Sequence, residues 1–480
     1  MILYRYRPIE SAIKELDNET FHFATREELN DPIEGFVRVY WQGDKAAWEG
    51  LLRNYICSLC HAIELFLIRA DENILHHKSL IIDLRRYDGI PYGKIMKELG
   101  DRFLADEEIQ KLTSYYGKNN IKVREEELRV ILHSIHNKAL IFCFETWNNV
   151  EISGVAVKQY LSDIFFPSTD SSMSLNWIDN RLIDFEFRKE LAKHLEAIIE
   201  DACDTQYLRM GLENDLFLYG IRIDQNGIAI PAEKISDARM NRNRMSVAVD
   251  FHQIYVAQLK DMIYPESYVV CFSSDSTNSA MWGNYAEHHR GVCLIYETDE
   301  NNAIGIQLHN EMRNCTANKV TYGGKTIERN FFTTFGRLTD AVIRIWLTGT
   351  EGLSDCYKEF EDEEVWRISY WYSYISKNYQ KTKEWEHEQE YRIVIDNYVC
   401  KYDDPNSRNL KYDFKSLKGV IFGINTSEYD KKRIVHSIMQ KKGKFIQFAF
   451  YQAEYNDEEQ KITVREKYYG YSELYNHLGE

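Results

Sequence analysis

The clearest pattern of apolar and polar positions lies in residues 268–297. Residues 268–273 are mostly apolar and predict a central strand that is covered on both faces. A serine-rich turn follows at 274–278, then helical spacing at 279–288, and a second apolar run opens after Gly291. We therefore expect a strand, helix and strand here. The hydroxyl groups at the strand-to-helix junction could hold a polar ligand, or could only cap the helix.

Shorter patterns of the same kind lie at both ends of the chain. Near the start, residues 2–7 and 20–24 predict strands, residues 9–16 predict a helix, and Asn30 and Asp31 form a turn that is also a candidate site loop. Near the end, the pattern predicts strands at 419–423, 445–452 and 461–465 and a helix at 428–439. Together these segments predict an α+β fold with a mixed, mostly antiparallel sheet.

The middle of the chain has a different character. Apolar residues recur at helical spacing in five segments, at 45–70, 92–103, 106–116, 123–146 and 184–208. We therefore predict that residues 1–40 and 263–480 form the α+β core and that residues 41–262 are a large helical insertion. Two further helices are expected in the core, at 330–347 and 354–378.

Residues 383–395 carry candidate chemistry on an alternating pattern. Tyr391 and the apolar residues after it alternate with Glu388, Glu390 and Arg392, so a strand would place the two carboxylates and the cation on one face. A carboxylate held in this way can stabilise the sugar cation that forms when a glycosidic bond breaks. The alternative is a solvated strand edge with a salt bridge.

Composition limits the class of protein. The 480 residues carry a formal net charge of -16, which argues against a protein that coats nucleic acid backbones. No window reaches the roughly 18 apolar residues of a membrane span, and the start of the chain lacks a signal-peptide run, so we expect a cytoplasmic protein that does not enter membranes. The nine cysteines are scattered and fit buried, reduced thiols.

Two short motifs and the histidines do not carry chemistry. The CSLCH sequence at 57–61 resembles a haem-attachment site but lies in a helical pattern of a chain without an export signal. The GGKT sequence at 323–326 lacks the first glycine of a phosphate-binding loop. The histidines show no metal-ligand spacing with carboxylates or thiols, so we expect no metal site.

Several motifs, in this order, resemble the bacterial domain-of-unknown-function family 2971. They are LYRYRPI (3–9), FHFATREELNDP (21–32), CFSSDSTNSAMWGNYAEHHRGVC (271–293), WEHEQEYRIVI (385–395) and GVIFG (419–423). The motifs skip residues 41–262, which agrees with an insertion into a compact domain. The resemblance by itself implies no settled activity.

A second resemblance is to the ADP-ribosyltransferases. It rests on three short signatures in the same order along the chain: Tyr4-Arg5, Phe272-Ser273-Ser274 and Glu388-Gln389-Glu390. The resemblance implies a fold like theirs and NAD as the substrate. It also implies that Arg5 contacts NAD, that Ser273 or Ser274 orders the nicotinamide pocket, that Glu390 is the catalytic carboxylate and that Glu388 selects the acceptor. It requires Arg5, Ser273 and Glu390 to line one pocket.

Other residues join this candidate NAD site. The middle signature lacks the family's threonine, and Asn30 and Asp31 are candidates to replace part of the family's loop chemistry. The other candidate binding residues are Tyr4, Trp282, Tyr285, His289 and Arg392. For Trp282 and Tyr285 the alternative is packing in the core, and for His289 it is a capping or solvent-facing role.

The sequence therefore predicts an enzyme that cleaves NAD and transfers ADP-ribose to a protein or nucleic acid acceptor, or only hydrolyses the bond. The family's bacterial setting would suit a toxin or an anti-phage defence effector, and oligomers could form through the helical insertion. One alternative is a metal-dependent nuclease that uses Asp31 and Glu390 as metal carboxylates. The other is a ligand sensor or interaction module without catalysis.

Overall fold

The computed structural model describes residues 1–31, 33–69, 81, 91–149, 151–152, 155–165, 246–324, 326–397, 402, 404–441 and 448–468. The chain forms two compact units: unit 1 comprises Met1–Arg38, Pro265–Ile327 and Ser369–Glu480, and unit 2 comprises Val39–Tyr264 and Glu328–Ile368. The expected insertion at 41–262 falls inside unit 2, which also takes in 328–368. The helical pattern at 184–208 lies outside the described residues.

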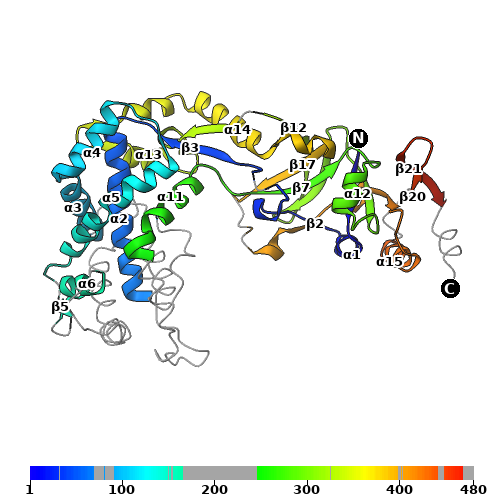
Figure 1. The fold of residues 1–480 in the computed structure, drawn as a ribbon, viewed down its shortest axis with the longest axis horizontal. Coiled ribbons are helices and arrows are strands. Elements are labelled where there is room, and N and C mark those ends of the chain that lie inside the picture. The colour runs from blue at the N-terminus through cyan, green and yellow to red at the C-terminus, as the bar shows by residue number, and fades with distance from the viewer. Residues whose placement is uncertain are drawn as a thin grey trace. The chain divides into compact units, whose positions relative to one another are not determined.

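Unit 1 is built on an eight-stranded sheet (Figure 1). Neighbouring strands in the order of the sheet are β11 (Asn318–Lys319), β17 (Glu390–Asp396), β7 (Ser267–Ser273), β1 (Ile2–Arg7), β8 (Val292–Glu297), β19 (Leu417–Phe422), β20 (Ala449–Asn456) and β21 (Lys461–Tyr468). Only β19 and β20 run parallel, and the other neighbours are antiparallel. The prediction of an α+β fold with a mostly antiparallel sheet is therefore confirmed, whereas the likeness to an ADP-ribosyltransferase fold stays a prediction.

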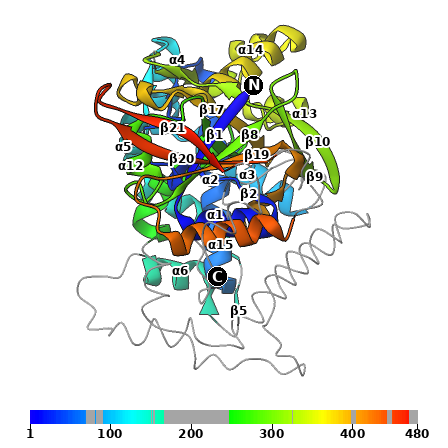
Figure 2. The ribbon, with the colours of Figure 1, turned by 90° about the vertical axis from the view of Figure 1, so that its right-hand side faces the viewer.

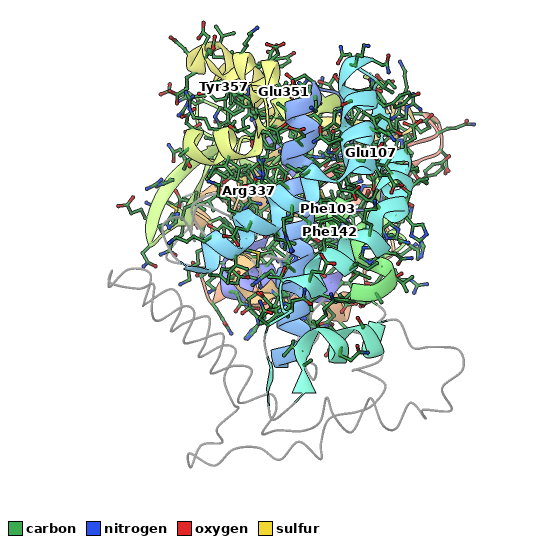
Figure 3. All side chains as sticks on the ribbon, turned by 90° about the vertical axis from the view of Figure 1, so that its left-hand side faces the viewer. Phe103, Glu107, Phe142, Arg337, Glu351 and Tyr357 are labelled. Atoms are coloured by element: carbon green, nitrogen blue, oxygen red, sulfur yellow. The ribbon has the colours of Figure 1, made fainter. Side chains whose placement is uncertain are left out.

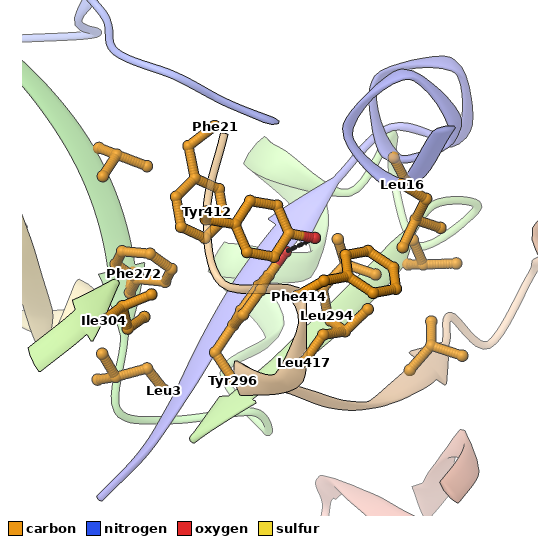
Figure 4. Close-up of a cluster of buried hydrophobic side chains, with 14 of the residues drawn as sticks. Leu3, Leu16, Phe21, Phe272, Leu294, Tyr296, Ile304, Tyr412, Phe414 and Leu417 are labelled. Atoms are coloured by element: carbon orange, nitrogen blue, oxygen red, sulfur yellow. Dashed lines mark hydrogen bonds between the residues drawn. The ribbon is translucent and has the colours of Figure 1, made fainter. Parts of the chain in front are cut away.

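One face of this sheet carries the main hydrophobic core of unit 1. The helices α1 (Ile9–Asn18) and α15 (Glu428–Met439) lie side by side and contribute their apolar residues to it (Figure 2). Figure 4 shows its aromatic centre, where Phe21 stacks on Tyr412 with ring centroids 4.1 Å apart. Alternation along β1 and β17 directs residues such as Leu3 and Ile393 into this core.

The opposite face of the sheet is covered in part by the short helix α12 (Ser279–Tyr285), whose Trp282 is fully buried against Tyr6. The helix ends at Tyr285, three residues earlier than predicted, because residues 287–289 adopt left-handed backbone conformations with φ of 51°, 53° and 67°. This turn brings the chain back to the start of β8. There, Gly291 packs so closely that a Cβ atom would lie 2.2 Å from the carbonyl oxygen of Arg7.

Unit 2 is mainly helical. It contains α2 (Lys45–Arg69), α3 (Pro91–Ala105), α4 (Glu107–Lys118), α5 (Glu125–Glu145), α6 (Val157–Phe165), α11 (Phe251–Asp261) and α13 (Asp340–Trp346). The central helix α2 is apolar on most sides and packs against α3, α4 and α5 (Figure 3). Between α3 and α5, the rings of Phe103 and Phe142 meet edge to face at 5.4 Å. The predicted helices at 45–70, 92–103, 106–116 and 123–146 are therefore present, with small shifts at their ends.

Three predicted elements differ in the structure. The expected helix at 330–347 is a strand β13 (Ile327–Asn330), a 3-10 turn and α13, because Asn330 caps the turn and two phenylalanines, Phe331 and Phe335, pack against Trp346. The expected helix at 354–378 is a 3-10 turn followed by α14 (Glu363–Asn378). The expected strand at 383–395 begins only at Glu390, since a 3-10 helix at Lys383–Glu388 and a left-handed Gln389 precede it.

Among the described residues, none of the helices combines the length and the hydropathy that crossing a lipid bilayer requires.

Candidate functional site

A buried cluster of charged side chains lies in unit 1, next to the end of β7. It consists of three carboxylates and two cations, each no more than 6% exposed, and we call it the charge cluster: Glu34, Lys381, Glu388, Glu390 and Arg392. Burying an unpaired charge is costly, so such a group must pair its charges closely. We therefore expect each carboxylate of the charge cluster to lie close to at least one of the two cations.

Local backbone features position the cluster. Glu390 is the first residue of β17, and the left-handed Gln389 separates it from Glu388, which ends the preceding 3-10 helix. Lys381 lies on the two-residue strand β16 (Gln380–Lys381), which pairs with β12 (Thr321–Tyr322). The hydroxyl of Tyr322 accepts a hydrogen bond of 2.7 Å from the backbone N–H of Glu390. The sequence pattern predicted that the two glutamates lie side by side on one strand. This prediction was wrong, because Glu388 lies on the 3-10 helix and only Glu390 lies on β17.

The two cations bridge the carboxylates. Arg392 donates from Nε and Nη2 to the two oxygens of Glu390, at 2.7 and 2.8 Å, and its Nη2 also contacts Glu34. Lys381 Nζ lies 2.6 Å from Glu388, 3.2 Å from Glu390 and 3.6 Å from Glu34. The two hydrogen bonds from Arg392 to Glu390 have the bidentate geometry that makes an Arg–carboxylate pair strong and fixes its orientation. Glu390 is consequently held in one position by both cations.

The proton affinities follow from this geometry. Burial alone would raise the pKa of Glu390, but the charge and hydrogen bonds of Arg392, helped by Lys381, hold this pKa at about 2. Burial lowers the pKa of Lys381, yet the carboxylates around it, Glu390 first, raise it above its ordinary value. Burial raises the pKa of Glu34, and Arg392 opposes that effect. Glu390 is therefore an anion throughout the physiological pH range.

The predicted pocket serines lie beside the cluster. Ser273 is the direct cross-strand partner of Glu390, and its Oγ donates to the backbone carbonyl of Glu388 at 2.7 Å. The exposed Ser274 donates to the side chain of Gln389 at 3.2 Å. Tyr285, from α12, donates to Glu388 Oε1 at 2.6 Å, and burial followed by Glu388 raises the pKa of its hydroxyl. The structure thus brings Ser273, Ser274 and Tyr285 together with both glutamates.

The N-terminal turn also reaches the cluster. Asn30 is close enough to Tyr285 to lower the pKa of its hydroxyl, against the larger effects of burial and Glu388 that raise it. Asp31 is 4% exposed, and its Oδ1 accepts the backbone N–H of Ile33 at 2.9 Å, while its Oδ2 has no hydrogen-bond partner among the described residues. Its charge is close enough to raise the pKa of Glu34. The Asn-Asp turn predicted as a site loop is therefore part of this region.

Arg5 is not part of it. Its Nε donates to Glu15 at 3.1 Å and its Nη1 to the carbonyl of Cys271 at 2.8 Å, and its guanidinium lies over the rings of Phe21 and Phe272 in the main core. Glu390 and Arg392 alternate with the core residues of β17 and so point to the other face of the sheet. The structure therefore does not bring Arg5 to the serines and the glutamates.

Three further predicted residues have other surroundings. Tyr4 and Trp282 pack in the smaller hydrophobic cluster beneath α12, and the indole N–H of Trp282 donates to the carbonyl of Ser276 at 2.9 Å. His289 lies in the left-handed turn, where its backbone N–H donates to the carbonyl of Trp282, and its buried Nδ1 has no hydrogen-bond partner in the part of the chain that the structure describes. For Trp282 the structure shows the packing role that was the alternative.

Sequence reasoning missed two members of the cluster. Glu34 lies three residues beyond Asp31 and could have been included with the site loop. Lys381 lies on a two-residue strand that no periodicity marks, and only its ion pairs identify it. Within the ranges that the structure describes, no group of three or more His, Cys, Asp or Glu residues is arranged to hold a metal ion.

The fold and the cluster define an α+β protein with a helical second unit. Residues 281–393 match the family model described as "Protein of unknown function (DUF2971)". The matched stretch contains Tyr285, Lys381, Glu388, Glu390 and Arg392, and it confirms the resemblance to the domain of unknown function over these residues. Comparison with curated proteins and with solved structures returned no significant match. The ADP-ribosyltransferase resemblance is thus unsupported by the comparisons and stays a prediction.

Proposed function

We propose that unit 1 cleaves the bond between nicotinamide and ribose in NAD, with the charge cluster as its reactive centre. The observation that carries the proposal is the pairing of Ser273 with Glu390 across adjacent strands, together with the hydrogen bond from Ser273 to Glu388. Two signatures separated by more than a hundred residues in the chain thus meet at one place. The hydroxyls of Tyr285 and Ser274 lie around the same glutamates.

The chemistry asks for a fixed negative charge. When the bond between ribose C1′ and the nicotinamide nitrogen breaks, its electron pair goes to nicotinamide, which leaves neutral, and positive charge develops on the ribose. A carboxylate that is already ionised and oriented stabilises this charge without reorganisation. Glu390 meets both conditions because Arg392 and Lys381 keep it ionised and in place. Water or a macromolecular hydroxyl or amine then bonds to C1′ and loses its proton to solvent.

The proposal departs from the resemblance in the role of Arg5. Its guanidinium is committed to Glu15 and to the carbonyl of Cys271, so we assign it a structural role and not the NAD contact. No residue is assigned to the pyrophosphate in its place.

Access to the cluster requires movement. Glu388 and Glu390 are 2% and 5% exposed, so a substrate can reach them only if a neighbouring segment opens. The segment at 33–36 is the candidate, because Glu34 joins the cluster through its ion pairs with Arg392 and Lys381. Burial raises the pKa of Glu34, because its carboxylate is poorly solvated when it lies in the cluster. Opening of the segment would expose this carboxylate to water. We include opening of this segment in the proposal.

The test measures by chromatography the nicotinamide that is released from NAD, for the full wild-type chain and for Glu390→Gln. We expect turnover by the wild type and a loss of at least 100-fold in the variant, the size typical for removal of one electrostatic stabiliser. Glu386→Gln is the matched control, since Glu386 precedes Glu390 on the 3-10 helix at Lys383–Glu388 and its side chain is exposed. A wild type that releases no nicotinamide, or a Glu390→Gln variant with unchanged turnover, would contradict the proposal.

A second function, ligand binding without catalysis, is favoured by one observation. Each charged side chain of the cluster has an oppositely charged partner and is nearly inaccessible, which is also typical of a structural network. If unit 1 binds a ligand without catalysis, we expect NAD or another ligand to raise the melting temperature of the protein while no nicotinamide is released.

A further inference from the structure

The helix α14 (Glu363–Asn378, yellow in Figure 1) has two apolar faces. One face is buried and includes Tyr370 and Tyr374. The other is exposed to solvent and carries five large apolar side chains: Val365 (62% exposed), Ile368 (65%), Trp371 (36%), Tyr372 (73%) and Ile375 (52%). Five such residues on one helix face form a patch on the order of 500 Å², near the largest that monomeric proteins usually expose. Such a patch points to an interaction surface.

The spacing of this face is self-complementary. Val365, Ile368, Tyr372 and Ile375 follow one another at intervals of three, four and three residues, the spacing of a helix-pairing seam. This order of intervals is the same in both directions. An antiparallel copy centred on position 370 therefore places Val365 opposite Ile375 and Ile368 opposite Tyr372. Two-fold symmetry requires this kind of self-complementary patch.

The charges at the two ends of α14 agree with an antiparallel copy. At its N-terminal end four consecutive residues at 361–364 are acidic and exposed. At its C-terminal end lie Lys377 and, close by, Arg26, since burial and then the charge of Arg26 lower the pKa of Lys377 to about 8. Lys383 follows and is also exposed. An antiparallel pair places the acidic end of each copy next to the basic end of the other, whereas a parallel pair would bring the acidic ends together.

We propose that the exposed face of α14 binds a second copy of this chain in antiparallel orientation. The two patches would bury roughly 1,000 Å² in all, below the standard size of a specific interface, so the dimer should be a transient one that forms at micromolar concentrations. The surface lies outside residues 41–262, where the sequence had suggested an oligomer contact. It also lies outside the charge cluster, so it does not depend on the proposed function.

The test is sedimentation velocity of the full chain over roughly 1–200 µM under reducing conditions. We expect a concentration-dependent dimer for the wild type and a monomer at every concentration for Ile368→Glu/Tyr372→Glu. Both positions are exposed, so these changes should leave the circular dichroism spectrum and the melting temperature unchanged. The matched control is Val130→Glu, because Val130 is an equally exposed apolar residue on α5. It should dimerise like the wild type.

Orientation is tested by carbodiimide cross-linking of mixed ¹⁴N and ¹⁵N protein. Antiparallel pairing predicts mixed-isotope links between the acidic residues at 361–364 and Lys377 or Lys383. A wild type that stays monomeric, a dimer that survives Ile368→Glu/Tyr372→Glu, or a dimer without these mixed links would overturn the proposal.

Discussion

Acidification should weaken unit 2 through one buried histidine. His136, on α5, is 2% exposed, and its Nε2 lies 2.9 Å from the carbonyl of Val247 while its Nδ1 lies 2.8 Å from the hydroxyl of Tyr55. A carbonyl only accepts, so Nε2 carries the proton and Nδ1 accepts from Tyr55. A second proton, on Nδ1, would break this arrangement inside a site that is shielded from water.

The size of the effect follows from the pKa. Burial is the largest cause that lowers the pKa of His136 from 6.5 to about 4. Between these values the unfolded chain binds a proton that the folded chain does not, so stability is fully present above pH 6.5 and falls as the pH approaches 4. The full difference is ~3 kcal/mol, of which ~2 kcal/mol should be lost between pH 7 and pH 5.

The assay is urea unfolding at pH 7, 6 and 5. Unfolding is monitored by pulsed hydrogen exchange in peptides of α5, so that the measurement reports on unit 2 alone. His136→Gln should be less stable at pH 7 but should lose ~2 kcal/mol less than the wild type on acidification. His309→Gln, at an exposed position of unit 1, should keep the wild-type pH dependence. Equal pH dependence in the wild type and His136→Gln would refute the reasoning.

The other predictions concern buried charges and close packing. Lys381→Met leaves the carboxylates of the charge cluster under-neutralised and should cost unit 1 about 3–5 kcal/mol, measured by exchange in β17 peptides; a loss below ~1 kcal/mol would mean that the cluster is solvated. Glu15→Gln leaves the buried guanidinium of Arg5 and the partly exposed guanidinium of Arg7 without their carboxylate and should cost a similar ~3–5 kcal/mol, measured by exchange in β1 peptides; an unchanged exchange rate would contradict it. Gly50→Ala would place a Cβ atom 1.7 Å from the carbonyl oxygen of Trp346 and should lower the melting temperature of unit 2 by several degrees. Gly283→Ala, where a Cβ atom meets no atom of the described residues within 4 Å, is its control, and equal melting temperatures would contradict the packing argument.

Local patterns predicted much of the fold. The apolar run at 268–273 became β7, the alternation in residues 2–7 became β1, and the helical spacings at 45–70 and 123–146 became α2 and α5. These patterns depend on residues that are neighbours in the chain, and their period reflects the geometry of the element itself. Prediction failed at 330–339, where aromatic packing and a capping asparagine replaced helix by strand and turn.

The candidate site could be predicted only in part. The serines, the Asn-Asp turn and the two glutamates were found from local motifs, and the structure brings them together. The motif that contains Arg5 could not reveal that this cation pairs with Glu15 on the other face of the sheet. Which face a strand residue occupies depends on where the core lies, and one short motif does not specify that.

The sequence by itself determined the helical and extended segments and the kind of charged and hydroxyl groups that the protein carries, since these follow from local periodicity and composition. Only the tertiary structure decided that Lys381 neutralises both glutamates, that Glu34 pairs with Lys381 and Arg392, and that an apolar face of α14 stays exposed. The reason is physical: a buried charge takes its partner from whatever the fold brings within about 4 Å, and that partner can lie hundreds of residues away.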